Sequence, residues 1–176
     1  MVGPDRLRFD FSHLKQVTEK ELVEIEKQVN EMIRNNFQVQ AEVLPYNDAL
    51  ATGATAIFNE KYGKEVRVLK IGYPYVSSEL CGGTHVSQTG EIALFHIISE
   101  ASIGAGLRRI EAITGRHAEK LLQQQSNTIT RIAHLVDSSP DKLVEKIETV
   151  LQDLIETKKR LEQFEHQDVL NWAKQL

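Results

Sequence analysis

The chain has 176 residues, of which 41% are hydrophobic and 26% are charged, and its formal net charge is −4 with a pI near 5.9. This length allows one sizeable core or one modest core with an extension, and the acidic balance excludes an extended basic surface that binds nucleic acid indiscriminately. A single cysteine excludes an internal disulfide framework, and no apolar run resembles a signal peptide or a membrane span. We therefore expect a soluble, cytoplasmic protein with no membrane partner.

The first two thirds of the chain mix strand and helix patterns. Residues 6–11 alternate Leu7, Phe9 and Phe11 with charged residues, which predicts a strand with one buried face. Residues 18–36 open with a capping box from Thr18 and Glu21 and then show helical spacing. Further patterns predict strands at 38–46, 65–72, 90–100 and 106–114 and a helix at 47–62. No regular βαβ repeat is present, so the expected class is α+β with a mixed or antiparallel sheet and packed helices.

The composition changes at Gly115, which we take as the boundary between a domain at 1–115 and a helical region at 116–176. One helix is predicted at 116–136, and a second begins at Pro140 with Ser139 as its N-cap. The second helix carries a heptad seam, defined here as Leu143, Ile147, Val150, Leu154, Thr157, Leu161 and Phe164. Such a seam indicates either a helical hairpin that packs on itself or a short coiled coil that joins two chains. A homo-oligomer through these helices is thus one expectation.

The stretch "SSELCGGTHV" contains the only cysteine, Cys81, with His85 four residues later. A thiolate and an imidazole suit zinc, and Gly82 and Gly83 allow a backbone turn that makes both side chains face one point. A buried cysteine and a hydrogen-bonded histidine are also common structural residues. On the residues alone, both interpretations stay open.

Three blocks carry a family resemblance. "RLRFDFSH" at 6–13, "SSELCGGTHVSQTGEIALFHIISE" at 77–100 and "GAGLRRIEAITG" at 104–115 resemble consecutive parts of the editing domain of alanyl-tRNA synthetase. The two helices that follow resemble the linker after that domain. The resemblance implies the editing-domain fold of the threonyl and alanyl synthetases and an ester hydrolase that removes serine or glycine from the acceptor end of tRNA(Ala). It further implies zinc held by a His-x-x-x-His pair together with Cys81 and His85.

The chain also departs from that pattern. No His-x-x-x-His occurs in the 176 residues, and no counterpart of the ATP-dependent aminoacylation domain or of the C-terminal globular domain is present. We therefore expect an incomplete zinc site, little activity of this chain alone, and ATP binding only in an intact synthetase. His13 and His96 are considered as substitute ligands, although each is more simply a surface or core-edge histidine.

Several other residues receive roles through the resemblance. Gly82, Gly83 and Thr84 are candidates for contacting the substrate, with Thr84 pairing a serine hydroxyl or else the local backbone. Glu79 could act on the attacking water, or could form an ordinary salt bridge. Arg108 and Arg109 face opposite sides of a strand, so one could reach tRNA phosphate while the other pairs with a carboxylate such as Glu111. A second basic cluster, Lys61, Lys64, Arg67 and Lys70, is expected to be a solvated edge.

Three functions are consistent with these features. The first is an editing module that acts on mischarged Ser-tRNA(Ala) and Gly-tRNA(Ala) within a synthetase. The second is a non-catalytic module that binds tRNA or a partner protein. The third is a free-standing deacylase, which the missing His-x-x-x-His pair disfavours.

Overall fold

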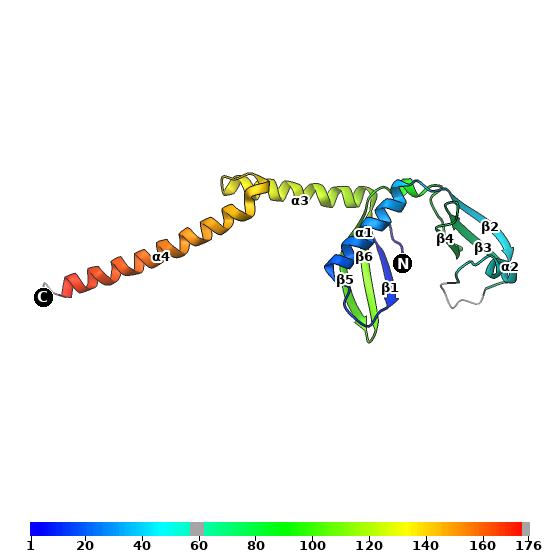
Figure 1. The fold of residues 1–176 in the computed structure, drawn as a ribbon, viewed down its shortest axis with the longest axis horizontal. Helices are drawn as coiled ribbons and strands as arrows, with labels where there is room; N and C mark the ends of the chain where they lie inside the picture. The colour runs from blue at the N-terminus through cyan, green and yellow to red at the C-terminus, as the bar shows by residue number, and fades with distance from the viewer. Residues whose placement is uncertain (57–61, 174–176) are drawn as a thin grey trace. The chain divides into compact units, whose positions relative to one another are not determined.

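A computed structural model describes residues 1–56 and 62–173. The chain forms two compact units, residues 1–120 and 121–176. The first unit combines two antiparallel three-stranded sheets with helices, and the second is helical (Figure 1). The expected α+β class is therefore confirmed.

The first sheet has the strand order β1-β6-β5, built from β1 (Leu7–Ser12), β5 (Phe95–Gly104) and β6 (Leu107–Thr114). Helix α1 (Glu19–Arg34) lies across one face of this sheet, as Figure 1 shows. The core between them contains Ile33, Phe95 and Ala112, and Leu7 packs against it. The strand predicted from the alternation at 6–11 is thus present, but the expected buried face is incomplete: Leu7 and Phe11 are half-buried, whereas Phe9 is 56% exposed.

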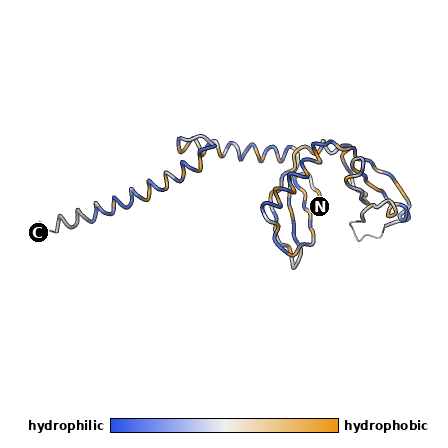
Figure 2. The backbone as a smooth tube through the Cα atoms, viewed as in Figure 1, coloured by the Kyte–Doolittle hydropathy of each residue, from blue (hydrophilic) through white to orange (hydrophobic). Residues whose placement is uncertain are grey.

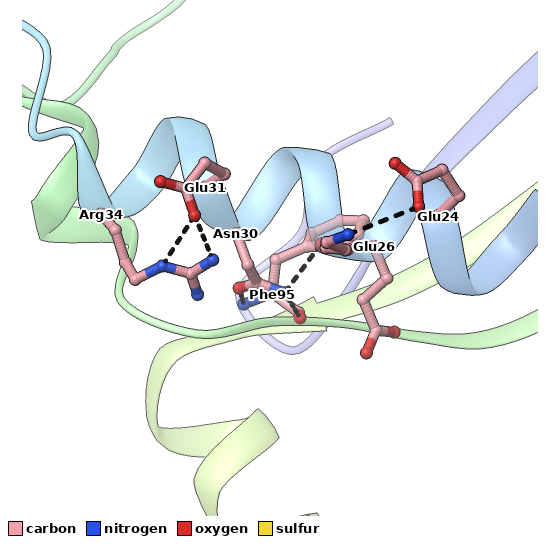
Figure 3. Close-up of polar contacts among 7 residues, drawn as sticks. Glu24, Glu26, Asn30, Glu31, Arg34 and Phe95 are labelled. Carbon is pink, nitrogen blue, oxygen red and sulfur yellow. Dashed lines mark hydrogen bonds and ion pairs between the residues drawn. The ribbon is translucent and has the colours of Figure 1, made fainter.

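The expected capping box of α1 is confirmed: the Thr18 hydroxyl accepts from the Glu21 N–H while the Glu21 carboxylate accepts from the Thr18 N–H. The same helix also covers the free edge of β5. Asn30 Nδ2 donates to the Phe95 carbonyl at 2.8 Å, and Asn30 Oδ1 accepts from the Phe95 N–H at 2.9 Å (Figure 3). Glu26 accepts from the Ile97 N–H at 2.8 Å. Two side chains therefore replace the neighbouring strand that an edge strand lacks.

The second sheet carries the sequence motif at Cys81. Its order is β2-β3-β4, from β2 (Val39–Pro45), β3 (Glu65–Ile71) and β4 (Ser77–Leu80). Its core consists of Val66, Val68 and Leu80 together with Ala49 and Ala54. Val68, at the centre of β3, has no exposed surface. The short strand β4 was not predicted, and it ends directly before Cys81.

The helix predicted at 47–62 is much shorter than expected. Helix α2 spans Tyr46–Ala51, and the Thr52 hydroxyl donates to the Ala49 carbonyl at its end. Gly53 follows with φ of 83°, a left-handed conformation that stops the helix. Thr55 then bridges to Glu79 of β4, so the chain is extended there. The predicted helix extended to Tyr62, and its residues 57–61 lie outside the described residues.

The strand predicted at 90–100 begins later than expected. Residues Thr89–Ile92 form a short 3-10 turn, η1, and β5 starts at Phe95. Thr89 is buried, and its hydroxyl donates to the Met32 carbonyl and accepts from the Phe37 N–H. These contacts hold the turn against the end of α1. The local hydropathy pattern does not reveal them, because Met32 and Phe37 are 57 and 52 residues away in the sequence.

Helix α3 (Gly115–Leu135) begins in the first unit, which ends at Lys120, and continues into the second unit. A 3-10 turn η2 (Pro140–Lys142) leads into α4 (Leu143–Ala173). Figure 2 shows hydrophobic positions recurring along α4 between hydrophilic ones. Seam residues Leu154, Leu161 and Phe164 are 48%, 57% and 68% exposed, so α3 does not bury them. None of the described helices has the length and apolar character needed to cross a membrane.

Candidate functional site

The candidate site is the loop after β4, residues 81–85. The Cys81 N–H donates to the Arg67 carbonyl at 3.1 Å, which continues the β3-β4 ladder by one residue. Cys81 is a free, half-buried cysteine, whereas residues 82–85 are exposed. The thiol therefore lies at the base of an open loop that a ligand can reach.

Gly83 lies between the two candidate metal ligands. A Cβ placed on Gly83 would lie 3.7 Å from Cys81 Sγ and 3.7 Å from His85 Cε1. Atoms of both side chains therefore border the same small volume, the one that a Gly83 side chain would enter. Any side chain larger than glycine at position 83 would begin to fill that volume.

The expected reason for the two glycines needs correction. Neither Gly82 nor Gly83 takes a positive φ, and a Cβ on Gly82 would meet no atom within 4 Å. A tight left-handed turn thus does not require them. At Gly83 a Cβ would make ordinary van der Waals contact with the thiol and the imidazole, so the absence of a side chain leaves the space beside these two groups open.

Arg67 of β3 holds this loop in place. Its Nη1 donates to the Cys81 carbonyl at 3.0 Å and to the Gly83 carbonyl at 2.7 Å, and it lies 3.3 Å from His85 Nδ1. A guanidinium only donates, so a hydrogen bond at this contact has Nδ1 as its acceptor and corresponds to the neutral tautomer with its proton on Nε2. The expectation that Arg67 belongs to a solvated basic edge is therefore wrong, while Lys61 of that cluster lies outside the described residues.

The residue set fits a zinc ion in part. A thiolate and an imidazole are suitable ligands, and they converge on the space above Gly83. Across residues 1–56 and 62–173, however, no three His, Cys, Asp or Glu side chains come together as a metal-binding group. His96 lies instead on β5, 3.1 Å from Glu26, and His13 lines an apolar pocket beside Phe11. Neither histidine joins Cys81 and His85.

Glu79 and Thr84, the polar residues near the two candidate ligands, differ in whether their side chains have a hydrogen-bond partner. Glu79 accepts a hydrogen bond from the Ser77 hydroxyl at 2.8 Å, so its carboxylate has a structural partner on the same strand. Thr84 is exposed, and its hydroxyl makes no hydrogen bond with the described residues. Of the two, Thr84 has the side chain that is free to contact a ligand.

The two adjacent arginines of β6 both pair with carboxylates, and neither pairs with Glu111. Arg108 forms a bidentate pair with Glu100, whose side chain is only 3% exposed, and the hydrogen bond from Arg108 holds the pKa of Glu100 below its ordinary value. Arg109 forms a bidentate pair with Asp10 at 2.7 Å, which lowers the pKa of that carboxyl. Arg108 is 14% exposed and Arg109 31%, so Arg109 is the more accessible of the two.

Comparisons with known proteins bear on this geometry. The family described as "Threonyl and Alanyl tRNA synthetase second additional domain" matches residues 66–111, which include β3 from its second residue, β4, the 81–85 loop and both arginines. The chain is 49% identical over 167 residues, 95% of its length, to an alanine-tRNA ligase of Dehalococcoides mccartyi. It is 45% identical to that of Chloroflexus aurantiacus and 47% identical to that of Listeria welshimeri, over 92% of its length in each case.

The chain spans about a fifth of the length of these relatives, 19% for the first two and 18% for the third. The resemblance to the editing-domain region of alanyl-tRNA synthetase is confirmed by these matches.

Proposed function

We propose that this chain, which matches a segment of alanine-tRNA ligases, is part of an editing module that hydrolyses the ester bond of Ser-tRNA(Ala) and Gly-tRNA(Ala). The observation that carries the proposal is the convergence of Cys81 Sγ and His85 on the space above Gly83. The partner on this proposal is the acceptor end of tRNA(Ala). Activation of alanine with ATP is not proposed for these 176 residues.

Cys81 and His85 would supply two zinc ligands, and further ligands would come from outside the 176 residues. When bound, zinc supplies positive charge that can orient the ester or activate water. The reaction adds water to the ester carbonyl, forms a tetrahedral intermediate and releases the amino acid from the ribose hydroxyl. Arg67 contributes by holding the two loop carbonyls, so that the loop keeps one geometry as substrate binds.

Selection of serine over alanine requires a fixed polar partner for one hydroxyl. The exposed Thr84 hydroxyl lies next to His85 and is free of hydrogen bonds within the described structure, so it can donate to or accept from that hydroxyl. Glu79 is held by Ser77 and is assigned a supporting role on the same strand. For Arg109 we retain the proposed contact with tRNA phosphate, since its guanidinium is the more exposed.

The helical unit is proposed to follow the editing module as a linker, with the domains divided near Gly115. The exposed seam on α4 gives it a surface for self-association through the C-terminal helices.

The proposal is tested in a chimera. The matching segment of the Dehalococcoides ligase is replaced by this chain, and hydrolysis of Ser-tRNA(Ala) is measured. We expect deacylation that is lost in Cys81→Ala and His85→Ala chimeras, with aminoacylation unchanged. The chain alone should hold well below one zinc per molecule and hydrolyse Ser-tRNA(Ala) slowly or not at all, because two ligands bind zinc weakly.

Two results would contradict the proposal. A chimera that aminoacylates normally but never deacylates would support a non-catalytic binding module instead. Stoichiometric zinc and rapid deacylation by the chain alone would show that the site is complete within these residues.

A further inference from the structure

A second pocket lies on the opposite end of the β3-β4 hairpin from Cys81. It has a volume of about 350 Å³, and its lining includes Tyr73, Tyr75, Asn35, Gln38 and Gln40. This volume is at the lower end of the range of small-ligand sites. The pocket differs from most such sites because amide side chains and aromatic rings, rather than aliphatic groups, surround it.

The two tyrosines present their rings to solvent. Tyr73 is 91% exposed and Tyr75 is 47% exposed, and their rings meet edge to face with centroids 6.2 Å apart. The turn that carries them is held in one shape: the Gly72 N–H donates to the Gln38 carbonyl at 3.0 Å, and Gly72 has φ of 80°. A Cβ on Gly72 would lie 3.1 Å from Val76 Cγ2. The rings are therefore displayed on a fixed turn.

The amides opposite the rings are free. Gln38 and Gln40 are two residues apart on an extended segment, so their side chains share a face. Neither side chain makes a hydrogen bond within the described part of the chain. A carboxamide offers one acceptor and two donors in a plane, the arrangement that reads the edge of a nucleobase.

The charges around the pocket do not suit a phosphate. The Lys70 ammonium, 5.1 Å from the centre of the Tyr75 ring, already pairs with Glu42. The chain as a whole is acidic, with a net charge of −4. Affinity for RNA at this pocket would therefore come from stacking and amide hydrogen bonds rather than from release of counterions.

We propose that the pocket between Tyr73, Tyr75 and the Gln38–Gln40 amides binds an unpaired nucleobase of RNA. The choice of RNA rests on the proposed function, whereas the choice of a base over a phosphate rests on the groups just described. Tyr75 precedes Cys81 by six residues, which spans at most about 20 Å at 3.3 Å per residue. The base and the aminoacyl end that the Cys81 loop receives would thus lie a few nucleotides apart on one strand.

The test uses the full 176-residue chain and a fluorescently labelled single-stranded RNA hexamer. A matched hexamer with abasic sites keeps every phosphate and removes the bases. We expect Tyr73→Ala to weaken binding of the intact hexamer by about 5- to 150-fold, the loss typical of one stacked base. Tyr73→Phe should bind as the wild type does, because it keeps the ring. Phe164→Ala, which removes a 68% exposed ring from α4, is the control and should have no effect.

Salt dependence separates the two kinds of contact. Each phosphate neutralised on a single strand adds about 0.7 to the slope of log affinity against log salt. A base-reading pocket predicts a shallow slope and weak binding of the abasic hexamer. Equal affinity of Tyr73→Ala and wild type, a steep slope with full binding of the abasic hexamer, or a pocket that binds a proline-rich peptide and no RNA would each overturn the proposal. None of these results depends on deacylation, so failure here leaves the chimera test of the proposed function unaffected.

Discussion

Replacement of Arg67 by alanine is expected to loosen the 81–85 loop without unfolding the sheet that carries it. The change removes the hydrogen bonds from Nη1 to the Cys81 carbonyl at 3.0 Å and to the Gly83 carbonyl at 2.7 Å. Hydrogen bonds from a charged donor contribute about 1.5–3 kcal/mol each, but the exposed Gly83 carbonyl can turn to water when its donor is lost. We therefore expect local opening of the loop to become easier by about 1.5–2.5 kcal/mol in total.

The measurement is hydrogen exchange of backbone amides followed by NMR. The Cys81 amide, which donates to the Arg67 carbonyl, reports on the loop, and the Val68 amide at the buried centre of β3 reports on the sheet. Protection of Cys81 should fall about 10- to 70-fold while protection of Val68 is unchanged. Arg34→Ala, which removes an exposed ion pair on α1, should alter neither amide.

A second readout is available because Cys81 is the only thiol in the chain. Its reaction with a thiol reagent should accelerate in Arg67→Ala. The acceleration should be smaller in Arg67→Lys, because the ammonium keeps a charged donor with three hydrogens although its side chain is one bond shorter. Unchanged exchange at Cys81 would refute the idea that Arg67 anchors the loop. Equal loss of protection at Val68 would assign Arg67 a role in the whole sheet instead.

Two further predictions concern the body of the first unit. Arg108 lowers the pKa of Glu100 below 4.5 in the folded chain. As the pH falls from about 4.5 through the lowered pKa, the unfolded state binds more protons than the folded state, so the free energy of unfolding should decrease. In urea titrations at successive pH values, Glu100→Gln should show a smaller decrease. Gly72→Ala should cost about 1–3 kcal/mol in urea unfolding because of its positive φ and the nearby Val76 methyl, whereas Gly82→Ala, with open space, should change stability by less than about 0.5 kcal/mol. A pH profile of Glu100→Gln parallel to that of wild type, or equal effects of the two glycine changes, would contradict these assignments.

The elements that local chemistry determines were predictable from the sequence. The Thr18–Glu21 capping box requires only residues three apart, and the start of α1 at Glu19 follows from it. The alternation around Leu7 likewise needs no knowledge of the partner strand. Each of these signals is contained within one or two turns or a few strand residues.

The elements that depend on distant partners were not predictable. Strand β4 has four residues, "SSEL", too few for a recognisable alternation, and it exists because β3 and Thr55 pair with it. The helix expected at 47–62 contains Gly53, and the helix ends at Ala51 because this glycine takes a left-handed conformation that its sequence pattern does not reveal. In the first sheet, nothing in the sequence near Asn30 indicates that its amide pairs with Phe95, 65 residues away.

At the candidate site, the convergence of Cys81 and His85 was predictable and its support by Arg67 was not. One signal did exist: Val66 and Val68 are the buried face of β3, so the intervening Arg67 must point to the other side. Its register opposite Cys81, one position beyond the Val68–Leu80 pair, is set by β4, which was the strand that sequence reasoning missed. Missing β4 therefore led directly to misreading Arg67 as a solvated residue.

Arg67 also connects the hydrogen bonding of the loop to its metal chemistry. A zinc-bound histidine commonly uses one ring nitrogen for the metal and donates a proton from the other to a carbonyl or carboxylate. Here Nδ1 of His85 faces a donor, which favours the neutral tautomer that carries its proton on Nε2 and has no lone pair there for a metal. Binding through either nitrogen requires the ring to give up its contact with Arg67. The hydrogen bonds from Arg67 to the Cys81 and Gly83 carbonyls do not involve the His85 ring. We therefore expect them to persist and to keep the loop in place when His85 leaves Arg67 to bind a metal.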